Sequence, residues 1–401
     1  MQTLLITERE SKEQVDVEDG EHLILHHEGD PDGPTLVVFG GIHGNEKSGV
    51  VALQHVASEI NRLQLNIRGR VFFVSGNTRA IKRSVRFVDA DLNRHWTAEN
   101  VKRNNAESLI ATNRAEDIEQ RELLEIIDMV IAGARNEVYS LDLHSTSSPS
   151  TPFAMLGDTL RNRTFAEEFP STFLLGIEEQ LDGTIMEYMN ELGAVTLGFE
   201  AGQHTTEIAV ENQKNLIWLA LANSGCVDRE DFEYEFFRDR MESAMGRLEI
   251  IEIRHRHAIS PEDEFRMEPG YATFQHVKKG EVLAHDRHGA IRAVESGMIL
   301  MPLYQDQGTD GFFIGREVNP VWMWISRVLR NRNVAAAIKY LPGVVRHPEN
   351  DMAYIVNTRV ARIMPLQIFH LLGLRKMRWH EDKLIVSRRR HDTKSPFVKN
   401  G

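Results

Sequence analysis

The stretch TLVVFGGIHGNEKSGVVALQHV, residues 35–56, decides the fold class of this chain. Its first five residues form an apolar run that predicts a buried strand, and its last seven predict the start of a helix. Between them lies a glycine-rich turn, residues 40–49, that carries His43 and Glu46. Open α/β sheets bind their ligands at the carboxyl edge of the strands, where this turn lies. The stretch therefore predicts a functional site on a strand-to-helix turn.

His43 and Glu46 have side chains that commonly bind zinc, and a catalytic zinc takes three protein ligands and a water molecule. The candidate for the third ligand is His144, at the carboxyl end of the apolar strand predicted over residues 138–145. Asp142 lies on the same face of that strand, because strand side chains alternate, and could orient a metal-bound imidazole. A single histidine at a strand end is more often structural. The joint pattern favours a zinc site, although ligand type alone also admits other divalent ions.

The composition is that of an ordinary globular protein, with 401 residues of which 41% are hydrophobic and 26% are charged. This length allows a large domain with a smaller one, or three domains. A single cysteine, Cys226, indicates a reducing compartment. The sequence shows neither a secretory leader nor an apolar run long enough to span a bilayer. We therefore expect a cytoplasmic protein with no membrane partner.

The net charge of -12 conceals an asymmetry. Residues 321–401 hold 16 Lys and Arg against 5 Asp and Glu, while the rest of the chain is acidic. A basic segment can bind nucleic acid, or it can pack on the acidic body or on a neighbouring subunit of a homo-oligomer. Because the segment is also rich in apolar residues, packing is favoured over nucleic-acid binding. The arginine-rich residues 388–395 are expected to form a mobile tail.

Alternating strands and helices predict an α/β fold. Residues 22–28, 35–39 and 71–74 read as strands, with a helix between the last two that ends near residue 63. A strand–helix–strand unit is typical of a parallel sheet, so we expect a mixed, mostly parallel sheet flanked by helices. The chain divides into three parts: an α/β domain over residues 1–230, a small all-β domain over 231–317, and a basic C-terminal extension of unknown role over 318–401.

A polar stretch with little periodicity runs from residue 75 to about 105 and reads as a long loop, which in a compact domain is usually functional or disordered. It holds Arg86, Asn93 and Arg94. Each arginine could bind a substrate carboxylate through its forked donors, and Asn93 could add a hydrogen bond. The alternative is a loop that satisfies itself, with aspartates such as Asp91 pairing the arginines. On this stretch alone, that alternative is favoured.

Glu200 ends another apolar strand, between Gly198 and Gly202. A carboxylate beside a zinc-bound water is the expected general base for amide hydrolysis. A solvated acid at a strand end is the alternative, and the strand alone does not decide between the two.

Four motifs in this order resemble the succinylglutamate desuccinylase/aspartoacylase family, a branch of the zinc carboxypeptidase-like fold. The motifs are HGNE at residues 43–46, DLNR at 91–94, DLHS at 142–145 and FEAG at 199–202. The resemblance covers about residues 20–317 and is clearest over 35–205. It is specific for the fold and for a zinc hydrolase, and much less specific for the substrate.

The resemblance implies a role for each candidate residue. His43, Glu46 and His144 would bind one zinc ion per chain, and Glu200 would activate the water. Arg86 would polarise the scissile carbonyl, and Asn93 and Arg94 would bind the substrate. Asp142 remains the candidate that orients a metal-bound imidazole.

Two departures from the family pattern concern the substrate. Aspartoacylases carry an arginine ten residues before the catalytic glutamate, where this chain has Asn190. They also use a tyrosine of the C-terminal domain, whereas Tyr304 stands at a different offset. A substrate with one carboxylate or a different acyl group is therefore expected as readily as N-acetylaspartate.

Together the motifs predict a zinc-dependent amidohydrolase that acts on linear amides other than peptide bonds and deacylates a small N-acylated amino acid or a related compound. The first alternative is a zinc carboxypeptidase-type peptidase on a short or cell-wall peptide, which would need an open groove rather than a capped pocket. The second is a binding protein of the same fold that has lost catalysis. The intact set of candidate residues argues against this second alternative.

Overall fold

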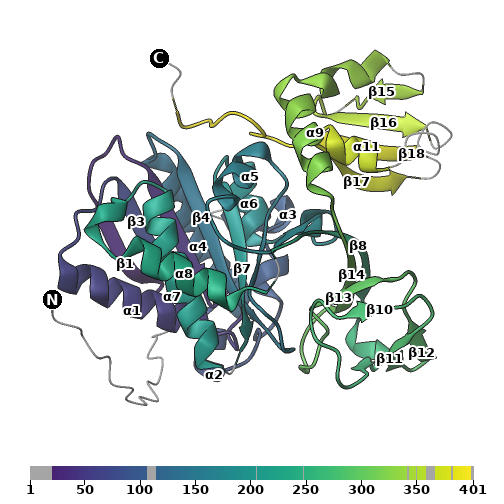
Figure 1. Ribbon diagram of the computed structural model, residues 1–401, viewed down its shortest axis with the longest axis horizontal. Coiled ribbons are helices and arrows are strands. Elements are labelled where there is room, and N and C mark those ends of the chain that lie inside the picture. The colour runs from purple at the N-terminus through teal and green to yellow at the C-terminus, as the bar shows by residue number, and fades with distance from the viewer. Residues whose placement is uncertain are drawn as a thin grey trace.

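The computed structural model describes residues 20–398 except 106–113, 205, 247, 341–342, 349, 358–365 and 381–382. Figure 1 shows a large α/β domain, a small β lobe that follows it in the sequence, and a separate C-terminal unit. Across the described ranges, we find no helix that is both long and apolar enough to cross a membrane.

The α/β domain alternates strands and helices along the chain. Its strands are β1 (Leu23–Glu28), β2 (Thr35–Gly40), β3 (Arg70–Ser75), β4 (Val138–Thr146), β5 (Phe153–Met155), β6 (Phe173–Leu175), β7 (Val195–Gln203) and β8 (Ile250–Ala258). Its α-helices are α1 (Ser48–Leu63), α2 (Thr78–Arg83), α3 (Ala98–Asn105), α4 (Ala115–Ala132), α5 (Leu160–Ala166), α6 (Ile185–Glu191), α7 (Glu207–Asn223) and α8 (Tyr234–Ala244). Short 3₁₀ turns include η1 (Leu92–Arg94) and η2 (Ile177–Glu179).

The strands of this domain form a mixed sheet in the order β1-β3-β2-β4-β7-β5-β6-β8. The neighbours from β3 to β7 are parallel, as are β5, β6 and β8, whereas β1 and β5 pair antiparallel with β3 and β7. The predicted mixed, mostly parallel sheet is thus confirmed. In the parallel pairing of β4 with β7, His144 lies directly opposite Glu200. The register therefore brings two candidate site residues to the same edge of the sheet.

Helices cover both faces of the sheet, and strand β2 shows why. Leu36 and Val38 pack in a core cluster with α1 and α7, whereas Val37 and Phe39 pack in a second cluster with α4 and α6. All four side chains are fully buried. Side chains alternate along a strand, so a continuous apolar run buries both faces of the sheet.

The polar stretch after β3 is not the irregular loop that its lack of periodicity predicted. It contains α2, η1 and α3. Local side-chain caps begin two of these turns: the Asn77 side chain accepts a hydrogen bond from the Ala80 N–H, and the Asp91 side chain accepts one from the Asn93 N–H. Helices of this length are too short to show a hydrophobic period.

The small β lobe follows α8, which packs on α7. Its strands are β9 (Arg266–Met267), β10 (His276–Val277), β11 (Val282–Asp286), β12 (Gly289–Arg292), β13 (Gly297–Leu300) and β14 (Asp310–Glu317). Strands β12, β11 and β9 form a separate sheet, while β14, β13 and β10 continue the main sheet beyond β8. The domain limits at residues 230 and 317 stay a prediction.

The C-terminal unit is a folded α/β unit. It comprises α9 (Pro320–Asn331), η5 (Val334–Tyr340), β15 (Val344–Arg346), β16 (Ala353–Asn357), α11 (Leu366–Leu371), β17 (Leu374–His380) and β18 (Lys383–Arg388). The strands form an antiparallel sheet in the order β15-β16-β18-β17. Buried residues of this sheet, including Tyr354 and Val386, pack with Phe369 in a core of their own.

The basic segment packs on the acidic body, as predicted. Arg330 on α9 is fully buried and pairs with Asp158 of the α/β domain and with Asp392. The expectation of a mobile tail over residues 388–395 is wrong, because Arg389 is buried and Asp392 accepts a hydrogen bond from the Leu160 N–H. Arginine runs are usually solvated, but here the carboxylates that pair them come from distant parts of the chain.

His370 on α11 connects this unit to the α/β domain. Its Nδ1 lies 2.9 Å from Glu252 on β8, and its Nε2 lies 3.0 Å from Glu179 in η2. Burial alone lowers the pKa of His370, and nearby Arg389 lowers it too, but the hydrogen bonds to the two glutamates outweigh both and raise the pKa to about 9. A histidine with a raised pKa in the folded state stabilises the fold in its protonated form.

Raising the pH from 6.5 to about 9 is therefore expected to weaken the docking of the C-terminal unit. The contribution of His370 is complete below its unfolded pKa near 6.5 and is lost as the pH passes its folded pKa, at a cost of at most roughly 3 kcal/mol. Urea unfolding at several pH values measures this slope, which His370→Gln should flatten. The exposed His276 provides the control, His276→Gln. An unchanged slope in His370→Gln would contradict the assignment.

Candidate active site

The turn between β2 and α1 holds the first candidate ligands against α2. Gly41 adopts a φ of +73°, which favours glycine. A Cβ at Gly44 would lie 2.2 Å from the backbone carbon of Ala80. The side chain of Asn45 donates a hydrogen bond of 2.8 Å to Gln305, which fixes the turn against the β lobe. The glycines thus allow the close backbone packing that positions His43.

Gly44→Ala is expected to displace this turn, because the new methyl group would overlap a backbone atom rather than a movable side chain. We expect a loss of about 1–3 kcal/mol in the free energy of unfolding and weaker metal uptake. Urea unfolding and metal titration measure the two effects. Gly246→Ala is the control, since the nearest atom to its Cβ lies at 3.9 Å. Equal behaviour of the two variants would refute this account of the turn.

The three predicted metal ligands converge at the carboxyl edge of the sheet. His43 Nδ1 lies 3.0 Å from Glu46 Oε1, and His144 Nδ1 lies 2.9 Å from Glu46 Oε2. All three side chains are buried, and one ligand atom from each lies within 4.8 Å of the others. Burial raises the pKa of Glu46, but the two imidazoles outweigh burial and hold the pKa well below its usual range. Two imidazole nitrogens and an ionised carboxylate are a donor set that fits zinc.

Carboxylates hold the far side of both imidazoles. Asp142 Oδ2 lies 2.6 Å from Nε2 of His144, where the sequence placed it, and Asp91 Oδ1 lies 3.2 Å from Nε2 of His43. Such contacts orient a metal-binding ring and raise its basicity. Arg86 contacts the same Asp91 through Nε and Nη2, each at 3.2 Å, and its Nη2 lies 2.8 Å from His43 Nε2. The contact of Asp91 with His43 was not predicted.

A second cluster of possible ligands, His22, Glu119 and Glu122, lies at the start of α2. Its carboxylates already pair with a cation, because Arg79 Nη1 lies 2.8 Å from both glutamates. Four charged or titratable groups therefore satisfy one another without a metal. This cluster is structural.

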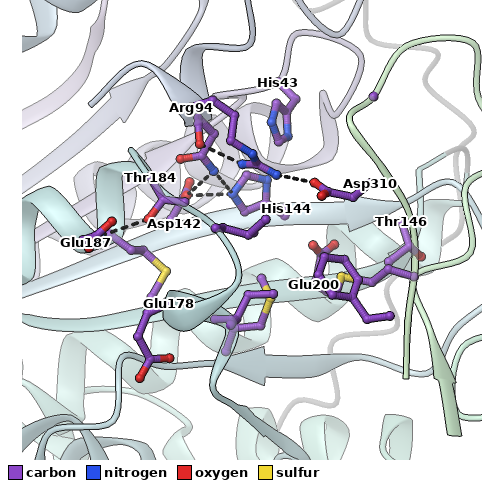
Figure 2. Close-up of a pocket in the computed structure, with 18 of the residues that line it drawn as sticks. His43, Arg94, Asp142, His144, Thr146, Glu178, Thr184, Glu187, Glu200 and Asp310 are labelled. Carbon is purple, nitrogen blue, oxygen red and sulfur yellow. Dashed lines mark hydrogen bonds and ion pairs between the residues drawn. The ribbon is translucent and has the colours of Figure 1, made fainter. Parts of the chain in front are cut away.

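Glu200 lines the same cavity as the candidate ligands (Figure 2). Its side chain is buried, and Oε2 has no hydrogen-bond partner within the described part of the chain. Burial raises the pKa of Glu200 to about 8; His144 lowers the pKa and Glu46 raises it further. A bound divalent cation would lower this pKa. Glu200 is therefore not the solvated acid at a strand end that the sequence left open as the alternative.

Asn93 and Arg94 in η1 also line the cavity. The Asn93 side chain donates to Asp142 at 3.4 Å and accepts a hydrogen bond of 2.9 Å from the Ile185 N–H. Arg94 Nη2 donates to Asp310 at 2.6 Å, whereas its Nε is buried without a partner among the described residues. Asn93 is therefore held by the protein, while Arg94 keeps a free donor. Their substrate-binding roles stay predictions.

A loop of the β lobe, residues 301–310, covers one side of the cavity. Met301, Leu303 and Asp310 are among its lining residues. Gln307 accepts a hydrogen bond of 3.0 Å from the Arg86 N–H, which ties this loop to the α/β domain. The contacts come from residues more than 200 positions apart, so no local pattern could predict them.

Tyr304 does not line this cavity. Its hydroxyl donates to the Glu268 carbonyl at 2.8 Å and accepts from the Tyr271 N–H at 2.9 Å. Tyr304→Phe is therefore expected to leave the catalytic rate unchanged within about twofold, since surface substitutions away from a site have small effects. Steady-state kinetics check this, and a tenfold loss would show that the tyrosine reaches the substrate.

The cavity has a volume of about 170 Å³ and reaches the C-terminal unit. Arg375 on β17 and Arg389 after β18 are part of its lining. Asn190, at the position where aspartoacylases carry an arginine, lines it too. No sequence motif indicated the two arginines, because they belong to the extension outside the motifs.

A mixed sheet flanked by helices brings two histidines and two glutamates together at its carboxyl edge, and this arrangement defines an α/β domain with a candidate single-metal site. Residues 32–216 match the family model for the succinylglutamate desuccinylase/aspartoacylase catalytic domain. These residues are less than half of the chain, and over them the chain is similar to the succinylglutamate desuccinylase/aspartoacylase family. The small β lobe and the C-terminal unit lie outside the matched range.

Individual relatives agree with this family. The aspartoacylase of Mus musculus is 32% identical over 121 residues, which are 28% of this chain and 34% of the mouse protein. The alignment thus spans only about a third of that relative. The probable aspartoacylase of Prochlorococcus marinus is 22% identical over 283 residues, 67% of this chain and 87% of that protein.

A solved structure of succinylglutamate desuccinylase/aspartoacylase from Rhodobacter sphaeroides shares the fold. Its TM-score is 0.53 at 18% sequence identity, and the match covers 74% of this chain and 88% of that chain. At this identity the likeness concerns the fold alone.

Proposed function

We propose that this protein is a zinc-dependent hydrolase that cleaves the amide bond of a small N-acylated amino acid or a related compound. The observation that carries the proposal is the convergence of His43, Glu46 and His144 beside the unpaired carboxylate of Glu200 in one cavity. The names of its relatives, aspartoacylase and succinylglutamate desuccinylase, support this reaction class.

His43, Glu46 and His144 would hold the zinc ion. A bound zinc ion would supply a Lewis acid that polarises the amide carbonyl and lowers the pKa of a water molecule to about 7. Glu200 Oε2 would accept the proton of the attacking water and return it to the leaving amine. The guanidinium of Arg86, which Asp91 holds in place, would stabilise negative charge on the carbonyl oxygen.

Arg94 would bind a polar group of the substrate through its free Nε–H. Asp310 fixes the orientation of this guanidinium, because it accepts a hydrogen bond from Nη2. The small volume of the cavity and the loop over residues 301–310 favour a small substrate over a peptide, which needs an open groove. The peptidase alternative is therefore less well supported.

Metal analysis combined with a substrate screen tests this proposal. We expect about one zinc per purified chain, release of free amine from at least one N-acyl amino acid, loss of this activity on chelation, and recovery on addition of zinc. A protein that neither contains nor takes up a divalent metal would overturn the ligand assignment. A zinc-loaded protein that hydrolyses no amide in a panel of N-acyl amino acids would overturn the proposed reaction.

A further inference from the structure

One end of the cavity is charged and lies away from the candidate metal ligands. Figure 2 shows Glu178 at this end, with its carboxylate directed away from His43 and His144. We call this the distal charged end and define it by four lining residues: Glu178 in η2, Glu187 on α6, Arg375 on β17 and Arg389 after β18. The α/β domain supplies the acids and the C-terminal unit supplies the arginines.

These residues pair across the boundary between the two parts. Arg375 Nη1 lies 2.8 Å from Glu187, and Arg389 Nη2 pairs with Oε1 of Glu178. The side chain of Arg389 is 5% exposed and that of Glu178 is 10% exposed. The C-terminal unit is thus part of the cavity wall, and it brings two cations to a cavity whose other lining is largely that of the α/β domain.

The pairing of Glu178 with Arg389 is incomplete. Glu178 Oε2 and Arg389 Nη1 are both buried, and neither has a hydrogen-bond partner among the residues that the structure describes. Buried polar atoms are nearly always paired, so an unpaired acceptor and an unpaired donor on one ion pair are available to a ligand. A ligand that pairs with both atoms donates one hydrogen bond and accepts another.

The lining also includes an apolar portion. Met155, Ile177, Leu181 and Met186 are among its residues. A ligand that fits this cavity therefore has a polar reactive group, an apolar portion and a polar group that carries both a donor and an acceptor.

We propose that the distal charged end binds the α-amino acid group of the substrate, an assignment that rests on the proposed function. The α-ammonium binds Glu178 Oε2, and the α-carboxylate binds Arg389 Nη1. The scissile amide is then on the side chain, so the substrate is an Nω-acylated diamino acid whose methylene chain contacts the apolar lining. Hydrolysis adds one water to the amide and releases the acyl carboxylate and the free diamino acid. In an Nα-acylated amino acid the α-nitrogen belongs to the amide and offers no ammonium to Glu178.

Matched substrates test this assignment. Nδ-acetylornithine carries the α-ammonium and 5-acetamidopentanoate lacks it, while their amides are alike. We expect wild-type kcat/KM to favour Nδ-acetylornithine by about 10–100-fold, the range of a hydrogen bond to a charged group. Nα-acetylornithine should be a poor substrate. In Glu178→Gln the preference should fall to within about threefold.

Glu191→Gln is the matched control, because Glu191 lies on α6 near Arg375, at 3.8 Å, but does not line the cavity. It should keep the full preference. Circular dichroism and the melting temperature establish that each variant folds.

Binding of the product gives a readout that does not depend on turnover. By calorimetry, ornithine should bind the wild-type protein at least about tenfold more tightly than 5-aminopentanoate, and Glu178→Gln should bind the two equally. Hydrolysis of N-acyl compounds without any preference for the α-ammonium, or a preference that Glu178→Gln retains, would overturn this assignment and leave the proposed function standing. Selective ornithine binding without hydrolysis of any amide would support the subsite and overturn the proposed function.

Discussion

Replacing Glu200 by glutamine is expected to lower kcat for amide hydrolysis by about 10²–10⁴-fold, the usual contribution of a general acid–base group. Glutamine has nearly the same shape as glutamate, but it can neither accept the proton of the attacking water nor return it to the amine. Glu200 is not one of the candidate metal ligands His43, Glu46 and His144, so the variant should still contain about one zinc per chain.

Steady-state kinetics on zinc-loaded protein, with metal content measured on the same samples, check this prediction. Glu207→Gln is the control, because Glu207 is an exposed acid at the start of α7, the helix that follows the strand of Glu200. It should leave kcat unchanged. A Glu200→Gln variant that keeps both its zinc and more than a tenth of the wild-type kcat would show that another group moves the proton.

The candidate metal ligands and Glu200 could be predicted from the sequence because each lies in an apolar strand or in the turn that follows one. In a mostly parallel sheet the carboxyl ends of the strands lie at one edge. Residues at these ends can therefore be predicted to lie close together, even when they are distant in the sequence. His144 and Glu200 illustrate this, since they stand opposite each other in the pairing of β4 with β7. Asp142 was found by the same argument, from the alternation of side chains along β4.

Other parts of the site gave no local signal. Asp310 and Gln305 come from the β lobe, and Arg375 and Arg389 come from the C-terminal unit. Their positions depend on the packing of separate parts of the chain, which neither periodicity nor spacing records. Charge composition did indicate that the basic segment packs on the acidic body, but it did not identify the partners.

The same limit applies to the fold. The strands of the parallel sheet were predicted within a few residues, because apolar runs bounded by glycine and proline mark them. The short helices between residues 75 and 105 were missed, since their stability comes from caps and tertiary contacts rather than from an amphipathic face. The continuation of the main sheet through β14 and β13 was missed too, because strand neighbours distant in sequence leave no pattern.

Replacing Arg330 by methionine is expected to destabilise the docked C-terminal unit by about 3–5 kcal/mol, the usual cost of removing one partner of a buried ion pair. The guanidinium is fully buried. It donates to the Asp158 carbonyl at 2.6 Å, lies 3.3 Å from Asp158 Oδ1, and donates from Nε to Asp392 Oδ2 at 3.2 Å. The variant would leave Asp392 and Asp158 each with one cation fewer.

The charge on Asp158 matters because this carboxylate is buried. Burial raises the pKa of Asp158, but Arg163, Arg330 and Arg389 outweigh burial and hold the pKa far below its usual range. An ionised, buried carboxylate that loses one of its cations must either take up a proton or attract water. Either response weakens the contact between the α/β domain and the C-terminal unit, which also carries Arg389 into the cavity.

Hydrogen exchange of the amides in β16 and β18 measures the stability of this unit directly. The control is Arg332→Met, because Arg332 lies two residues away and is exposed. Adding Asp392→Asn to Arg330→Met should recover part of the loss, since the double variant no longer leaves that carboxylate uncompensated. If these amides exchange as slowly in Arg330→Met as in Arg332→Met, the buried ion pairs do not hold the C-terminal unit in place. These ion pairs then do not position Arg375 and Arg389 in the cavity.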